Sequence, residues 1–160
     1  MIETAQLAGF FAAHAVWSVS DGEALIPLIG YEHPDGSRGM DRFLHEDIAD
    51  GAHAALESLQ DNSNGYARAA VAIDAFLHVA GGKVDALIVE AHQYGLTPGR
   101  LKVAVPYRPR TETSTFAVYR AKVLESMDDQ DTLMNAFFDG VDAHEDAAPV
   151  WHNAYEDVSV

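Results

Sequence analysis

"ARAAVAIDAFLHVAGGKVDALIVEAHQYG", residues 67–95, is the stretch of sequence that decides the fold. On both sides of Gly81 and Gly82, apolar residues recur at every second position, which is typical of β-strands. Two consecutive glycines between such runs favour a two-residue hairpin turn. With Gly81 and Gly82 as the turn, Ala80 lies opposite Lys83, and the sequence predicts a long antiparallel hairpin.

The residues before this hairpin predict two helices and a shorter hairpin. Residues 4–19 place apolar side chains on all sides of a helix, which is typical of a helix packed on both faces. The turn signal "HPDGS" (33–37) separates an apolar run at 25–31 from a returning run at 38–43. Residues 41–60 carry one apolar stripe at helical spacing and predict an amphipathic helix.

The residues after the long hairpin predict a second hairpin and a last helix. "LKVAVPYRP" (101–109) and "STFAVYRAKVL" (114–124) both alternate with period two across a polar loop. A helix is predicted around 131–146, and residues 145–160 are predicted to form an irregular tail.

The predicted elements follow the order α-β-β-α-β-β-β-β-α. Crossovers between parallel strands need a dozen or more residues, and the spaces between the last four strands are too short for them. We therefore predict a single α+β domain over residues 1–160. Its helices are expected to pack on one face of a mostly antiparallel sheet of about six strands.

The formal net charge is −15, and the acidic residues concentrate towards the two ends of the sequence. Residues 1–61 carry eleven acidic and two basic residues, residues 62–124 carry four and eight, and residues 125–160 carry ten and none. This balance argues against nucleic acid as a partner, because acidic surfaces repel phosphate backbones. It suits a basic protein partner, and it also suits simple solubility.

No feature of the sequence predicts export or a membrane partner, and we expect a cytoplasmic protein. The apolar stretch at 7–17 lacks a basic n-region and is shorter than the roughly 20 residues of a membrane span. The chain has no cysteine, so disulfides and thiolate zinc sites are excluded. Phosphate-loop, dinucleotide, zinc-protease and serine-hydrolase motifs are absent, and we predict neither a cofactor nor a metal site.

Glu90 and His92 interrupt the apolar run that follows Gly82. Strand alternation places them on the same face as Val71 and Ile73. A lone buried carboxylate is costly, so it would be paired, hydrogen-bonded or protonated. Three interpretations stay open: a solvated rim beyond the covering helix, a ligand or substrate cleft, or a buried structural pair.

In the cleft interpretation, Glu90 and His92 are the candidate catalytic residues, with Glu90 as general base and His92 as acid. Tyr94 follows on the same face, and His14 reaches the cleft from the helix at 4–19. Both are therefore candidate ligand-binding residues. The pocket would lie between that helix and the sheet.

Basic residues of the second hairpin form another candidate ligand-binding site. If Leu101 lies opposite Ala121, four cations share one face: Arg100, Lys102, Arg120 and Lys122. Like charges across a ladder are destabilising unless an anion neutralises them. That anion is either the acidic segment after Glu125 or a bound small anionic ligand.

Two other groups are interpreted as surface features. His78 lies opposite Asp85 in the predicted register, as an exposed cross-strand pair rather than a catalytic dyad. Several polar side chains lie opposite the apolar stripe of the helix at 41–60, which is the expected wet face of a surface helix. They are Glu46, Asp50, His53 and Glu57.

Three functions remain in competition. We favour a protein-interaction or inhibitor-like module for a basic partner, because the excess of acidic residues at both ends is counted directly from the sequence. The alternative is a small-molecule-binding protein or an enzyme with its pocket near Glu90 and His92. The third is a self-associating homodimer, joined through the hairpin that contains Pro27 or through the last strand. The sequence leaves open whether the chain is an enzyme, and we lean against it.

Overall fold

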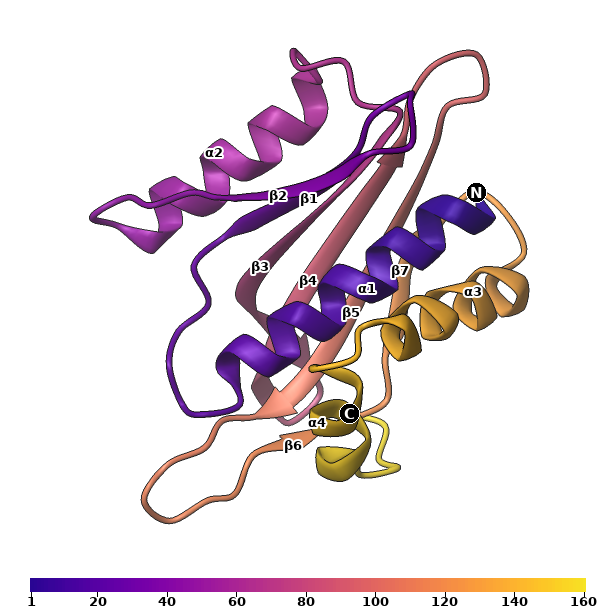
Figure 1. Cartoon of the computed structure of the whole chain (residues 1–160). Helices are drawn as coiled ribbons and strands as arrows, with labels where there is room; N and C mark the ends of the chain where they lie inside the picture. The colour runs from indigo at the N-terminus through magenta and orange to yellow at the C-terminus, as the bar shows by residue number, and fades with distance from the viewer.

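The computed structural model describes residues 1–160 and contains four helices and one seven-stranded antiparallel sheet (Figure 1). The helices are α1 (Ile2–Val19), α2 (Ile48–Asp61), α3 (Gln130–Ala143) and α4 (Ala148–Ala154). The strands are β1 (Leu28–Glu32), β2 (Arg38–Arg42), β3 (Arg68–Val79), β4 (Gly82–Gln93), β5 (Gly99–Arg108), β6 (Ala117–Val118) and β7 (Lys122–Ser126). The predicted α+β class is confirmed, with β6 and α4 as additional elements.

The strands follow the order β2-β1-β3-β4-β5-β6, and β7 also pairs with β5. β5 is flanked on its outer side by β7 along Leu101–Ala104 and by β6 along Tyr107–Arg108. A bulge between Lys102 and Val103 shifts the β5–β7 register. Leu101 lies opposite Ser126 instead of Ala121, and the pairing differs from the prediction on both sides of the bulge, so the predicted register of this hairpin was wrong.

The long hairpin forms with a turn one residue earlier than predicted. Val79 pairs with Gly82, so Ala80 and Gly81 form the turn and the pairing shifts by two residues. Gly82 has φ = +132°, a conformation that favours glycine. A shift of two keeps every side chain on its predicted face, because strand side chains alternate with period two.

One face of the sheet is covered by α1, and α3 packs against α1 (Figure 1). The core on this side contains 27 buried residues and joins strand residues such as Leu87 and Val103 to both helices. The two helix backbones approach closely at glycines: a Cβ on Gly9 would lie 1.7 Å from the carbonyl oxygen of Phe137, and one on Gly140 would lie 1.9 Å from that of Gln6. Only glycine fits at such a crossing.

The opposite face carries α2, which corrects the prediction that all helices lie on one side. Asp47 caps the start of this helix by accepting the Ala49 N–H, and Asn62 ends it with φ = 45°. Ala55 and Leu59 of α2 pack on Ala69 and other residues of β1 and β3 in a smaller core of six buried residues. The helix contacts β1 and β3, so it covers only part of this face.

The C-terminal segment is more ordered than the predicted irregular tail. It contains α4, whose Trp151 is 2% exposed in the core beside Phe137. Tyr155 then forms a parallel bridge with Val118 of β6. None of the helices combines the length and apolar character that a membrane span would require.

Candidate functional site

Glu90 and His92 lie on β4 and share a face with Val71 and Ile73, as strand alternation predicts. His92 is 7% exposed, and its Nε2 lies 3.1 Å from Oε1 of Glu90. This face is the one that α2 partly covers. The predicted pocket between the first helix and the sheet is therefore misplaced, because the sheet itself separates α1 from these two residues.

The environment of the pair keeps Glu90 ionised. The hydrogen bond from His92 lowers the pKa of Glu90 against the opposing effect of burial, and the charges of His92, Lys102 and Arg100 lower it further. Glu90 is therefore a carboxylate that accepts the Nε2–H of His92. The Nδ1 of His92 has no partner in the chain and is not fully buried. In the neutral ring this nitrogen is the free base, and Glu90 orients it.

A groove of about 560 Å³ opens beside His92, where the end of α2 meets the turn between β4 and β5. The predicted residues His92, Tyr94 and Arg100 all line it. The sequence reasoning missed Gln60 and Met127, which line it from α2 and from the segment after β7. No local pattern marks these two, because they reach the groove only through the path of the folded chain.

Tyr94 has a structural role in this groove. Its hydroxyl donates a hydrogen bond to the backbone carbonyl oxygen of Leu59 near the end of α2. Burial raises the pKa of Tyr94 well above its ordinary value. The phenol therefore stays neutral and ties β4 to α2, which forms one wall of the groove.

The four predicted cations separate into two groups. Arg100 lies opposite His92, Lys102 lies opposite Glu90, and Lys122 lies beside them opposite Ala104. Arg100 pairs with Glu125 at 3.1 Å. Arg120 is outside the strands and pairs with Asp157 of the C-terminal segment at 2.5 Å. The chain thus neutralises two of these cations internally, and the predicted four-cation patch does not form.

His14 belongs to the other side of the sheet and does not reach Glu90. Its Nδ1 lies 3.1 Å from Nε2 of His144, while Nδ1 of His144 accepts the N–H of Ala147. His144 must therefore donate to His14, and the proton on Nε2 of His14 is buried without a partner. Burial, then the charges of His144 and Arg42, lower the pKa of His14. It is a packing residue that holds α1 against the start of the C-terminal segment.

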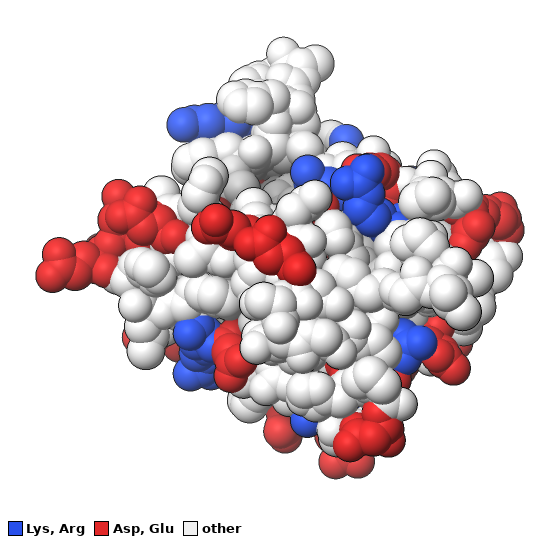
Figure 2. Space-filling view, turned by 90° about the horizontal axis from the view of Figure 1, so that it is seen from above, with Lys and Arg blue, Asp and Glu red and all other residues white.

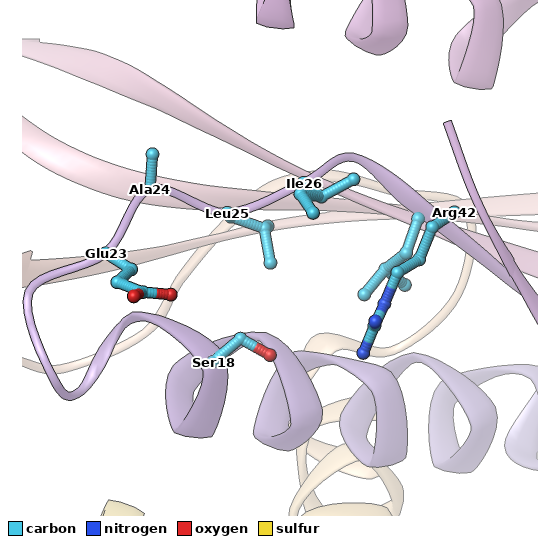
Figure 3. A pocket seen from close by; sticks show the side chains of 7 residues that line it. Ser18, Glu23, Ala24, Leu25, Ile26 and Arg42 are labelled. Carbon is cyan, nitrogen blue, oxygen red and sulfur yellow. The ribbon is translucent and has the colours of Figure 1, made fainter. Parts of the chain in front are cut away.

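A separate hollow of about 230 Å³ lies between the end of α1 and the strands β1 and β2 (Figure 3). Figure 3 shows the Arg42 side chain pointing from β2 towards α1, with Ser18 on the helix and Glu23 on the far side. The sequence reasoning missed these residues. The alternation that places Arg42 on the same face as Met40, which packs against the core, was the available signal.

Tyr107 and Asp74 form a further polar pair at the margin of the α1 face. The hydroxyl of Tyr107 donates to the Asp74 carboxylate, at 2.8 and 2.9 Å from its two oxygens. Burial raises the pKa of Asp74, although the bond from Tyr107 opposes the shift. The predicted His78–Asp85 pair does not form, because the register shift places His78 opposite Lys83.

On the face that Figure 2 shows, the acidic residues form several separate groups, and basic side chains lie beside some of them. Five of the seven arginines are in ion pairs: Arg38 with Glu32, Arg68 with Glu3 and Glu32, Arg100 with Glu125, Arg108 with Glu156, and Arg120 with Asp157. A basic partner remains a prediction, and the total charge alone does not locate its binding surface.

No family model, curated protein or solved structure matches this chain. No group of three or more His, Asp or Glu side chains is arranged to hold a metal ion. The groove combines His92, which is hydrogen-bonded to Glu90, with the cation Arg100 and a hollow of the size that small ligands occupy.

Proposed function

We propose that the groove beside His92 binds a small organic anion, a carboxylate or a phosphate monoester. The observation that carries the proposal is the cross-strand pair of His92 and Arg100, which both line the groove. Side chains directly opposite on neighbouring strands are about 5 Å apart, so one small anion can contact both. The base and the cation therefore face the same hollow.

Arg100 retains capacity for a ligand although it is already paired. Its Nη2 contacts Glu125 at 3.1 Å, and its side chain is half exposed. A guanidinium has five N–H donors, so the others remain available to an anion. Lys102 forms no ion pair and adds a second positive charge on the same face.

The Glu90–His92 pair gives this site a function beyond binding. With Nε2–H held by Glu90, the Nδ1 of His92 can accept a proton from a bound molecule or from water. The ionised Glu90 stabilises the imidazolium that results. We propose that His92 is the proton acceptor of the site and Glu90 its positioning residue.

The binding test compares Arg100→Gln with Arg108→Gln. Arg108 is a matched control, because it also pairs with a carboxylate, Glu156, but lies outside the groove. Calorimetric titration would use inorganic phosphate, phosphate monoesters and short mono- and dicarboxylates. For an anion that the wild-type protein binds, Arg100→Gln should weaken affinity about 10- to 100-fold, since a hydrogen bond to a charged group contributes roughly 1.5–3 kcal/mol. Arg108→Gln should bind as the wild-type protein does.

His92 is tested by NMR of its ring with and without the bound anion. Binding should shift the His92 ring signals, while Glu90→Gln, which preserves a hydrogen-bond acceptor, should shift them in the free protein. The proposal fails if no anion gives saturable binding, or if Arg100→Gln and Arg108→Gln bind equally well.

A further inference from the structure

β3 has a free edge along its second half. β1 pairs with it only from Arg68 to Ala72, whereas β3 continues to Val79. Residues 23–27 follow the same side and make no backbone–backbone hydrogen bond with β3, although the backbone N–H of Leu25 faces the Asp74 carboxylate. The edge beyond Ala72 is therefore unpaired, although β4 remains paired along the other side.

The ladder pattern shows which backbone groups are free. The carbonyl of Pro27 accepts the N–H of Phe43 on the β2 side, so the backbone of the next residue, Leu28, faces β3 opposite Ala72. Every second residue of β3 from Ala72 onward faces the same way. Three residues thus direct both N–H and C=O to the free edge: Asp74, Phe76 and His78.

A slot of about 180 Å³ lies along this edge. Asp74 and Phe76 line it from one face of β3 and Ala75 from the other, so the slot straddles the strand. Its outer wall is formed by residues 24–25 and by Ile48 at the start of α2. Residues 24–25 also line the hollow shown in Figure 3, so they separate the two spaces.

The slot is apolar and acidic. Ile48 is 44% exposed and Phe76 is 54% exposed, although the ammonium of Lys83 lies 4.1 Å from the centre of the Phe76 ring. Asp74 and Asp85 both line the slot, and no basic side chain does. An occupant with aliphatic and basic side chains would complement these walls.

We propose that the free edge of β3 binds an extended, basic segment of another protein as an added strand. The backbone of the segment pairs with Asp74, Phe76 and His78. Its aliphatic side chains contact Ile48 and Ala75 on one face, and its basic side chains face Asp74 and Asp85 on the other. A second copy of this chain fits the edge less well. If its β3 paired here, its own β4 would overlap the outer wall of the slot. The proposal is independent of the groove beside His92.

The probe is a blocked seven-residue peptide in which valine alternates with lysine, added to the isotope-labelled full chain. NMR should show the largest amide shifts at Asp74, Phe76 and His78. Two control peptides replace the lysines by glutamates or carry N-methyl groups on the residues that face the edge. Both should bind at least tenfold more weakly, and binding of the basic peptide should weaken as salt is added.

Ile48→Lys should abolish binding, because it places a positive charge and a longer side chain in the wall of the slot. Leu44→Lys is the matched control, since Leu44 is 77% exposed and does not line the slot. Three results would overturn the proposal: no shifts at millimolar peptide, equal binding of the N-methylated peptide, or shifts that instead follow protein concentration without peptide. The last result would assign the edge to a second copy.

Discussion

The two faces of the sheet are covered to very different extents. On the α1 side, 27 buried residues join the sheet to α1, α3 and α4, and the helices meet at Gly9 and Gly140 with their backbones almost touching. On the α2 side, six buried residues join the sheet to one helix, and Glu90, Lys102 and Arg100 remain within reach of solvent. The comparison indicates that the incompletely covered face keeps the charged groups that a ligand can use.

The packed face depends most on the glycine crossing, and Gly140→Ala tests it with the largest expected effect. The added Cβ would lie 1.9 Å from a backbone oxygen of α1, so the helices must separate. Alanine favours the helix by about 1 kcal/mol relative to glycine. We nevertheless expect the free energy of unfolding to fall by about 3 kcal/mol or more. Urea denaturation provides the measurement.

Gly81→Ala is the control for this substitution. No atom lies within 4 Å of a Cβ at Gly81, and its φ is not positive, so stability should change by less than about 0.5 kcal/mol. If Gly140→Ala were as stable as Gly81→Ala, the close approach of α1 and α3 would be refuted.

Substitution of one leucine in each core compares the two faces directly, with losses of stability of intermediate size. Leu101 belongs to the large core and Leu59 to the small one, and they are 0% and 1% exposed. Leucine-to-alanine substitutions in cores cost roughly 2–5 kcal/mol, depending on how well the cavity can collapse. We expect both losses to be smaller than that of Gly140→Ala, and Leu101→Ala to cost more than Leu59→Ala, because the surroundings of Leu59 border solvent. Equal losses in urea denaturation would mean that the two faces are equally rigid.

The smallest effect is expected at Asp74, at the margin of the packed face. Its pKa is raised in the folded state, so the protonated form stabilises the fold below pH 3.8 and this contribution is lost as the pH rises through the folded value. Asp74→Asn should therefore raise the thermal midpoint at pH 7 and give no gain near pH 3. Because the group is partly exposed, the gain in the free energy of unfolding at pH 7 should be less than about 1 kcal/mol. The Tyr107 hydroxyl can still donate to the amide oxygen.

Asp139→Asn serves as the control, because Asp139 is exposed on α3. If Asp74→Asn gave the same gain at pH 3 as at pH 7, the burial of the Asp74 carboxylate would not be its cause. A loss of stability at pH 7 would mean that the charge of Asp74 is favourable where it lies.

The fold could be predicted to the level of elements, pairing direction and face. The long hairpin was predicted because its alternation is regular, and the turn error of one residue moved pairs without moving faces. The register of β5 with β6 and β7 was not predictable, because the connecting loop is long and a bulge follows Lys102. The C-terminal helix was missed because it is short and begins at Ala148 without a capping side chain.

The candidate site was also predicted in part, because strand alternation shows which side chains share a face. His92, Tyr94 and Arg100 were named from alternation and charge, and they line one groove. His14 was placed with them only because α1 was expected on their face. The ionisation of Glu90 was not predictable in full, since its pKa is lowered first by the hydrogen bond from His92 and then by the charges of Lys102 and Arg100, whose positions follow from the β4–β5 register.

By itself, the sequence determined which side chains share a face of the long hairpin. That outcome is robust because side chains alternate with period two, so any even shift in pairing leaves them on the same side. Only the tertiary structure decided that α2 covers this face while α1 and α3 lie on the other. Both faces offer apolar strand residues to a helix, and the choice between them is made by the packing of the whole chain.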